Sequence, residues 1–199
     1  MHAYHPGRRV QTGKGSTAVR RFNGPTADEI FVLCRPDDGV ADAARQAEMA
    51  YEAMLGALAS EGTGPEAIVT ETVFLRRVRE HFEAARSARS RVFGDAGLER
   101  CRPATTFIGQ PPLAKDAHLE LAAVAVLPRP TGSSSVHDVS RATACSCEAC
   151  ARGVRARVVR LGDQASLYTG NIHGSGRDAF EEAYDMFRVA EGLLAEAAM

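Results

Sequence analysis

Hydrophobic residues follow strand-like and helix-like spacings in turn along the first part of the chain. Runs at 17–22 and 29–34 are rich in β-branched and aromatic residues, which predicts two strands joined by a turn at 23–25. From about 42 to 60 the apolar residues recur every three or four positions, which predicts a helix. Its apolar face consists of Ala47, Tyr51, Met54, Leu55 and Leu58.

The same reading continues to about residue 129. We expect a strand at 67–75, a helix at about 78–93, and two closing strands at 104–109 and 118–127. The predicted order is therefore ββ-α-β-α-ββ. This order is typical of an α+β fold in which two helices pack on one face of a mixed sheet.

The pattern then begins again in the second part of the chain. Two strands are predicted at 154–161 and 165–172, followed by a helix that starts at Asp178 with Glu181 three residues on, a capping pattern. The helix would bury one face against the core. The residues predicted for that face are Phe180, Tyr184, Phe187 and Leu194. If exposed, they would form a partner surface or an aggregation hazard.

These patterns predict one whole domain and the opening half of another. We expect a flexible tail at 1–15, a complete domain at 16–129, a linker at 130–153 and a partial second copy at 154–199. A Pro- and Ser-rich stretch marks the start of the linker. A half domain cannot bury its own apolar face, so another copy, chain or segment must complete it.

Composition is that of an ordinary globular protein. Of 199 residues, 45% are hydrophobic and 25% are charged, and the formal net charge is -1. This near-neutral charge argues against nucleic-acid or membrane binding by bulk attraction. The sequence also contains no apolar run long enough to span a membrane and no signal-peptide pattern, so a cytoplasmic location is expected.

Three cysteines form a dense local group at Cys145, Cys147 and Cys150, with His137 upstream. Thiolates and imidazole are ligands for a tetrahedral zinc ion. A redox-active loop, or a merely ordered one, is an alternative interpretation of the same residues. No other cofactor is predicted.

Several segments together resemble the Rid family, also called YjgF or reactive intermediate deaminase. The resemblance is carried by the helix 46–58, the strand 67–75, the helix 82–93, the Pro103-Ala104 step and the strand 119–126. It implies a homotrimer, or a pseudo-trimer of tandem copies, with small-molecule metabolite sites between units. Most members of the family hydrolyse enamines or imines, and others only bind metabolites.

The resemblance also implies site residues. The family places an arginine just after the Pro-Ala step and a glutamate fifteen residues later; here these positions hold Thr105 and Glu120, which become the catalytic candidates. Threonine carries no charge with which to grip a carboxylate. The implied substrate-binding residues are Cys34, Arg35, Thr106, Tyr168, Thr169, Gly170 and Asn171.

The sequence leaves several functions open. In the first, Glu120 and the strand end at 169–171 position a water that hydrolyses an enamine or imine metabolite. In the second, the chain is a non-catalytic scaffold or metabolite-binding subunit, and Glu120 is a strand-end carboxylate paired with an arginine. A third is a chorismatase-like hydrolase in a longer tandem protein. Gly170, Gly174 and Gly176 match no phosphate-binding fingerprint.

Overall fold

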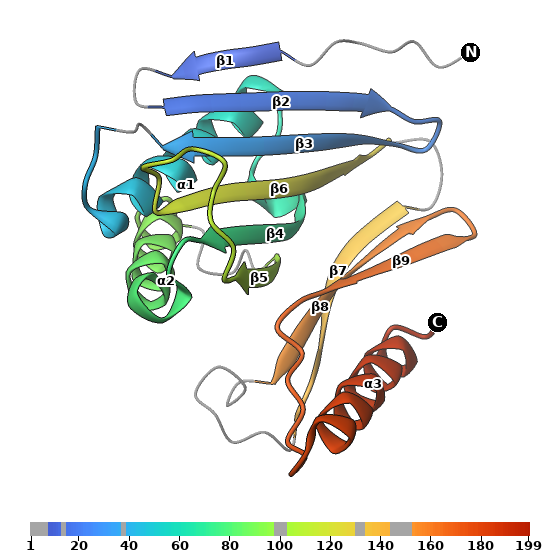
Figure 1. The fold of residues 1–199 in the computed structure, drawn as a ribbon. Helices are drawn as coiled ribbons and strands as arrows, with labels where there is room; N and C mark the ends of the chain where they lie inside the picture. Colours follow the sequence, from blue (N-terminus) through green and yellow to red (C-terminus); the bar gives the residue numbers. More distant parts are fainter. Residues whose placement is uncertain (1–7, 13–14, 37–38, 98–102, 130–133, 144–152) are drawn as a thin grey trace.

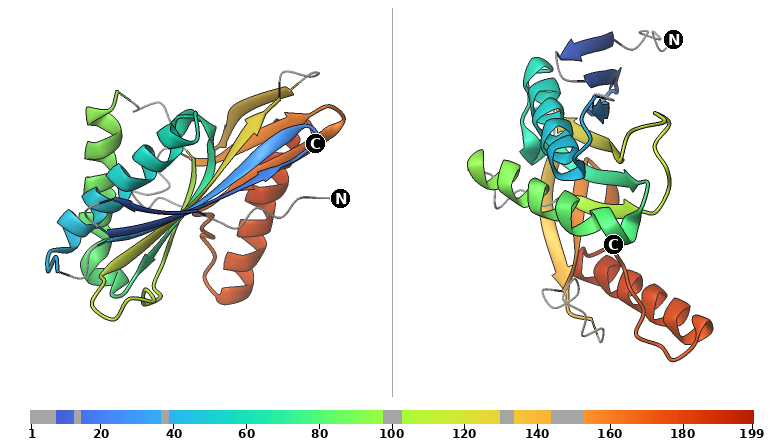
Figure 2. Two further views of the ribbon diagram at one scale, coloured as in Figure 1. Left: turned by 90° about the horizontal axis from the view of Figure 1, so that it is seen from above. Right: turned by 60° about the vertical axis from the view of Figure 1, so that its left-hand side comes forward.

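The computed structural model describes residues 8–12, 15–36, 39–97, 103–129, 134–143 and 153–199. Its first unit is a six-stranded mixed sheet in the order β1-β2-β3-β6-β4-β5, with two long helices on one face (Figures 1 and 2). The elements are β1 (Arg8–Thr12), β2 (Gly15–Asn23), β3 (Ala27–Pro36), α1 (Ala43–Ser60), β4 (Ile68–Leu75), α2 (Val78–Asp95), β5 (Ala104–Ile108) and β6 (Leu119–Pro128). The predicted α+β class and its two helices on one sheet face are confirmed.

The main core lies between this sheet and its helices. Helix α1 begins after Asp42, whose side chain accepts a hydrogen bond from the backbone N–H of Ala44. The helix then places Tyr51, Met54 and Leu58 against the strands, where all three are fully buried. Burial of each such side chain contributes roughly 1.5–3 kcal/mol to stability. The periodic spacing of apolar residues in this helix is therefore what fixes it on the sheet.

The second unit is a three-stranded antiparallel sheet with one helix. Its elements are β7 (Ser134–Arg141), β8 (Val154–Leu161), β9 (Gln164–Thr169) and α3 (Ala179–Glu196). The strands lie in the order β7-β8-β9, and Gly162 adopts a positive φ of 67° in the turn between β8 and β9. This sheet lies on the face of the first sheet that α1 and α2 leave open, and α3 lies beyond it (Figure 2).

Strand β8 joins the layers because both of its faces are buried. Val159 packs toward the first sheet with Val126, whereas Ala156 packs toward α3 with Leu193. Arg157 reaches across to the first sheet and donates hydrogen bonds to the backbone oxygens of Glu66 and Ile68, at 2.9 and 2.6 Å. The two sheets are therefore tied by apolar packing and by a buried guanidinium.

The structure differs from the prediction at two boundaries. Strand β1 lies inside the segment predicted as a flexible tail, and β7 lies inside the predicted linker. Backbone pairing supplies the reason, because β1 pairs with β2 and β7 pairs with β8 along their lengths. A polar strand at the edge of a sheet needs few apolar side chains. Composition alone therefore hid these two strands.

Helix α3 also turns a different face to its sheet than predicted. Val189 and Leu193 are its buried apolar side chains. The exposed fractions of Phe180 and Phe187 are 80% and 76%, and that of Tyr184 is 58%. The predicted core face is therefore an exposed aromatic stripe (Phe180, Tyr184, Phe187). None of the helices in the described ranges is long and apolar enough to cross a membrane.

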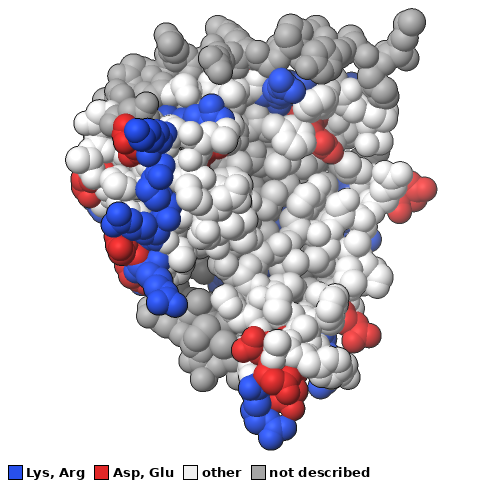
Figure 3. Space-filling view, in the orientation of Figure 1, with Lys and Arg blue, Asp and Glu red and all other residues white. Residues whose placement is uncertain are grey.

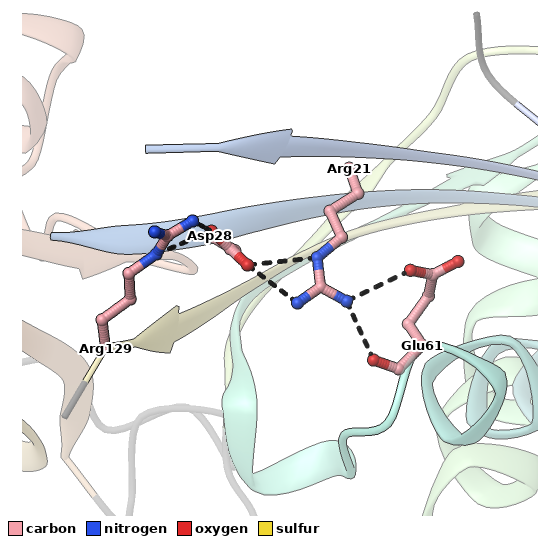
Figure 4. A network of polar contacts seen from close by, with 4 residues as sticks. All are labelled: Arg21, Asp28, Glu61 and Arg129. Carbon is pink, nitrogen blue, oxygen red and sulfur yellow. Dashed lines mark hydrogen bonds and ion pairs between the residues drawn. The ribbon is translucent and has the colours of Figure 1, made fainter. Parts of the chain in front are cut away.

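A polar network fastens one end of the first sheet (Figure 4). The Asp28 carboxylate accepts hydrogen bonds from Arg21 at 2.8 Å and from Arg129 at 2.7 Å, and Arg21 also donates to the backbone oxygen of Glu61 at 3.1 Å. Burial would raise the pKa of Asp28, but the two arginines together outweigh burial and lower it. The network links β2 and β3 to the end of α1 and to the segment after β6.

Charged side chains are distributed unevenly over the surface. Figure 3 shows Lys and Arg gathered along the left-hand side of the molecule, where α1 and α2 lie in Figure 1. Helix α3, by contrast, opens with acidic residues in its first turn, Glu181 and Glu182. Both charge types are thus present on one nearly neutral chain.

Candidate functional site

Arg35 and Glu120 form an ion pair on two neighbouring strands. Strand β3 pairs with β6, with Cys34 opposite Leu121, and this register places Arg35 next to Glu120. The Nε group of Arg35 donates to Glu120 Oε2 at 3.0 Å. The side chain of Glu120 is 8% exposed and that of Arg35 is 29% exposed. Strand β3 therefore places a positive charge directly beside Glu120.

This pair faces away from the helices. Leu119 and Leu121, on either side of Glu120, belong to the core under α1 and α2. Because side chains alternate along a strand, Glu120 points to the opposite face, where the second unit packs. Within the described part of the chain, the two Nη groups of Arg35 and the Oε1 atom of Glu120 have no hydrogen-bond partner. The pair can therefore still contact a ligand or a water.

The start of β6 is held by contacts on both sides of the loop that leads into it. Arg76 donates hydrogen bonds to the backbone oxygens of Ala117 and Ala114, at 2.8 and 2.9 Å. The buried Gln46 side chain accepts a hydrogen bond from the His118 N–H at 2.8 Å. These contacts fix the backbone two residues before Glu120 and so limit how far its carboxylate can move.

Thr105 lies on the other face of the sheet. Its hydroxyl donates to Glu71 Oε1 at 2.6 Å, and the same oxygen accepts a hydrogen bond from Arg89 on α2. Phe107, two residues on, packs against Phe82 of α2 with ring centroids 4.9 Å apart. Thr105 is thus part of the helix-side layer and does not meet Glu120. This placement argues against the catalytic role that the resemblance implied for it.

The Thr105 hydroxyl belongs to a buried polar cluster. Glu71 is fully buried, and Arg89 lies over the Phe93 ring with its Cζ 4.7 Å from the centroid. Tyr51 is also fully buried nearby; burial, followed by the charge of Glu71, raises its pKa well above the usual value. The cluster holds α2 to the strands. The cluster lies on the helix side of the sheet, and the Arg35–Glu120 pair lies on the opposite face.

Cys34 also faces the helix side. Its thiol accepts a hydrogen bond from the Thr17 hydroxyl at 3.8 Å, and both residues are buried. Burial raises the pKa of the Cys34 thiol to about 12. A thiol with that pKa is protonated at neutral pH and is a poor nucleophile. Cys34 is therefore a core residue, and only its neighbour Arg35 reaches the open face.

The second unit brings its own predicted residues against β5. A Cβ atom on Gly170 would lie 2.6 Å from the Thr105 backbone oxygen and 2.6 Å from Thr106 Oγ1. Only glycine permits so close an approach. Asn171 follows with a positive φ of 52°, a conformation that asparagine tolerates better than most residues. The structure therefore places Thr106, Gly170 and Asn171 together.

These three residues lie to one side of the ion pair. In the sheet, Glu120 is opposite Phe74, and Phe74 is opposite Ile108, two residues beyond Thr106. Strand spacing and rise then separate the backbones at Thr106 and Glu120 by roughly 12 Å. A small metabolite could contact one group directly, and a ligand of moderate length could span both.

Tyr168 and Thr169 complete the predicted set. Tyr168 packs between the two sheets, with Val126 and Val159 among its neighbours, and burial followed by the charge of Glu29 raises its pKa. Thr169 donates to the backbone oxygen of Arg155 at 3.3 Å. Both residues therefore hold β9 in place and do not line the surface beside Glu120.

The predicted cysteine site cannot be placed. Cys145, Cys147 and Cys150 lie outside the described residues, and so does Cys101. His137 is exposed on β7. Within the described ranges, no group of three or more His, Cys, Asp or Glu side chains could hold a metal ion. Zinc binding by the three cysteines remains a prediction.

Comparisons with known proteins give structural relatives of low sequence identity. No family model matches the chain, and no curated protein matches it. Among solved structures, the chain is similar to a candidate translation initiation inhibitor from Salmonella typhimurium, with 18% identity over 61% of this chain and 97% of that one and a TM-score of 0.48.

Two further solved structures are similar over about half of this chain. A member of the YjgF/YER057c/UK114 family from Mycobacterium tuberculosis is 18% identical over 48% of this chain and 77% of its own, with a TM-score of 0.40. Yeast Mmf1 is 19% identical over 54% of this chain and 84% of its own, with a TM-score of 0.42. At such identities, the function of this chain has to be argued from its own residues.

Proposed function

We propose that this chain is a Rid-like small-molecule protein that binds a small carboxylate metabolite beside Arg35 and Glu120 and hydrolyses an imine or enamine there. One observation carries the proposal: an arginine and a glutamate form a largely buried ion pair on the open face of the sheet. The arginine comes from β3, the strand that pairs with the Glu120 strand. Its guanidinium fork matches a carboxylate in geometry and charge.

The chemistry follows from the atoms that remain available. The Nη groups of Arg35 hold the carboxylate of a 2-imino acid, while Glu120 Oε1 accepts a hydrogen bond from a water and orients it. The water oxygen adds to the imine carbon, and one water proton passes through Glu120 to the nitrogen, which gives a carbinolamine. The remaining hydroxyl proton then passes to the same nitrogen as the C–N bond breaks and the C=O bond forms. The products are a 2-oxo acid and ammonia, so atoms and charge balance. An enamine would first tautomerise to the imine.

The second unit contributes residues that border the ligand site, and it contributes no catalytic group. Gly170 allows β9 to close on Thr106, and Asn171 stands exposed at the margin with a side-chain amide that can donate and accept. These residues lie on the same face as the ion pair. Their role in this proposal is to select ligand length.

The test compares hydrolysis of a freshly generated 2-imino acid by four proteins. Wild type should accelerate release of the 2-oxo acid. Glu120→Gln should lower this rate by about 10²-fold or more, because a general base typically accelerates a reaction by at least that factor. Arg35→Gln should raise KM strongly. Arg129→Gln, which removes an arginine from another ion pair of the same sheet, should leave the rate unchanged.

Two results would contradict the enzymatic proposal: no acceleration by wild type, or equal rates for wild type and Glu120→Gln. A second candidate function is metabolite binding without turnover, because the Arg35 guanidinium can hold a carboxylate whether or not Glu120 acts as a base. That function predicts saturable binding of a 2-oxo acid, lost in Arg35→Gln, with no hydrolysis by any variant.

We also propose that copies of the chain assemble into a trimer or pseudo-trimer through the aromatic stripe of α3. The support is the exposure of Phe180 and Phe187 on a helix whose other face already packs on β7 and β8. Light scattering should report a multiple of the 21.3 kDa chain mass for wild type. Phe187→Glu should shift the protein toward the single chain, and a wild-type monomer would overturn this proposal.

A further inference from the structure

A polar pocket lies in the second unit, on the α3 side of its sheet. It has a volume of about 190 Å³ and is formed by the end of β7, the loop before α3 and one face of α3. Its lining includes Arg141, His173, Ser175, Asp185, Arg188 and Val189. None of these residues takes part in the Arg35–Glu120 site.

Three glycines shape this region. A Cβ atom on Gly174 would lie 2.1 Å from the Glu182 backbone oxygen, and one on Gly176 would lie 2.3 Å from the Glu182 N. A Cβ atom on Gly192 would lie 2.1 Å from Arg141 Nε. Gly174 and Gly176 therefore let the loop lie against α3, and Gly192 lets the Arg141 guanidinium do so. They build a pocket at the side of the helix and not at its first turn.

The first turn of α3 is already satisfied. The Asp178 side chain accepts hydrogen bonds from the N–H groups of Phe180 and Glu181, both at 2.9 Å. An anion is not expected to bind there, because the backbone N–H donors already bond to the Asp178 carboxylate, which would also repel a negative charge. The charges that can recognise a ligand are those inside the pocket.

The pocket presents both signs of charge. Asp185 Oδ2 accepts hydrogen bonds from the Ser175 hydroxyl at 2.5 Å and from its N–H at 3.2 Å, and the Ser175 hydrogen bonds lower the pKa of Asp185. Arg188 makes no hydrogen bond to another described residue. Arg141 has a distant contact with Glu196, at 4.0 Å. Two cationic groups with unused donors thus stand beside one fixed carboxylate.

We propose that this pocket binds a small zwitterion of the α-amino acid class. The guanidinium groups of Arg141 and Arg188 receive its carboxylate, and Asp185 receives its ammonium group. Val189, only 9% exposed, offers an apolar contact for a short side chain. The fixed Asp185 carboxylate repels a purely anionic ligand such as phosphate, and the two arginines repel a simple amine. The volume fits a small amino acid.

The test is an NMR titration of the ¹⁵N-labelled chain with four probes: L-alanine, propionate, isopropylamine and inorganic phosphate. L-Alanine should give saturable shifts of the Gly174, Ser175 and Gly176 amides, and it should bind more tightly than each of the other three. Propionate lacks the ammonium group and isopropylamine lacks the carboxylate, so they separate the two halves of the recognition.

Variants locate the binding. Arg141→Gln, at a side chain that is 42% exposed and so tolerant of change, should weaken L-alanine binding by about tenfold or more. Arg177→Gln is the control, because Arg177 is exposed on the loop before α3 and pairs with Glu181 outside the pocket. It should change the affinity by less than about twofold. Arg35→Gln should also leave this binding intact.

Three outcomes would overturn the inference. They are the absence of saturable shifts with L-alanine, equal or tighter binding of propionate, isopropylamine or phosphate, and unchanged L-alanine affinity in Arg141→Gln. Because the pocket shares no residue with the Arg35–Glu120 pair, these outcomes are separate from failure of the imine hydrolysis test.

Discussion

Both units begin with three strands followed by a helix, but they bury that helix differently. In the first unit α1 packs on the sheet beside α2, and its Tyr51, Met54 and Leu58 are fully buried. In the second unit α3 covers a three-stranded sheet, and its Phe180 and Phe187 are 80% and 76% exposed. The contrast shows that an amphipathic helix can be placed by a minor apolar face when the strands under it offer few partners.

The largest expected effect is a loss of stability at the buried ion pair between Arg89 and Glu71 in the first unit. Arg89→Met leaves the fully buried Glu71 without its cation, so the free energy of unfolding should fall by about 3–5 kcal/mol. Urea unfolding at neutral pH measures the change. Arg77→Met, at the residue just before the same helix, removes an exposed ion pair with Glu80 and should cost less than about 1 kcal/mol.

A double variant distinguishes the buried charge from lost packing. Glu71→Leu combined with Arg89→Met removes both charges and should recover much of the stability, because an apolar pair needs no partner. A double variant no more stable than Arg89→Met would show that the helix-side contacts of Arg89, not its charge, hold α2.

The next effect compares the two faces of α3. Leu193→Ala removes a fully buried side chain and should lower the stability of the second unit by about 2–4 kcal/mol. Phe187→Ala removes an exposed ring and should change the stability of the single chain by less than about 0.5 kcal/mol. Thermal unfolding at low protein concentration tests both. Equal losses would mean that α3 packs with the predicted face inward.

A smaller effect is expected at Thr105. Thr105→Val keeps the side-chain shape but removes the donor to Glu71 Oε1, so stability should fall by about 1–3 kcal/mol. Thr105→Ser keeps the donor and should lose less. A loss of imine hydrolysis in Thr105→Val at a temperature where it is folded would instead restore Thr105 to the active site.

The smallest effect is expected in the network at the end of the first sheet. The folded pKa of Asp28 is lowered, so its stabilising contribution is present above its ordinary pKa near 3.8 and is lost as pH falls through the folded value. Both arginines are partly exposed, so solvent screening reduces this contribution to about 1 kcal/mol.

Asp28→Asn should therefore lower the stability at pH 7, and its difference from wild type should shrink toward pH 3. Chemical unfolding at both pH values measures this difference. Glu80→Gln, at an exposed ion pair on α2, serves as the control and should show little dependence on pH. A difference between Asp28→Asn and wild type that is constant with pH would contradict the assignment.

Local pattern was enough to predict the order of elements in residues 16–129, because each helix and strand there carries its own period. Long-range pairing was not predictable in this way. The neighbour of Glu120 is Arg35 only because β3 lies beside β6, and the partner of Thr105 is Glu71 only because β4 and β5 run parallel in that register. The local sequence pattern predicts neither pairing.

The buried face of α3 could not be predicted from local sequence either. Its strongest apolar stripe predicted a core containing Phe180 and Phe187, but the partners available to the helix are β7 and β8, which contact Val189 and Leu193. Sequence periodicity reports that a helix has an apolar face. Which face is buried within one chain depends on the elements that reach it.

The central claim is that Arg35, and not the residue at position 105, supplies the charge that holds a ligand beside Glu120. Titration of the ¹⁵N-labelled chain with pyruvate, the 2-oxo acid product of the simplest imine substrate, tests it directly. The account predicts saturable shifts centred on Arg35 and Glu120, and their loss in Arg35→Gln. Shifts centred on Thr105 and Glu71, or shifts that persist in Arg35→Gln, would contradict it.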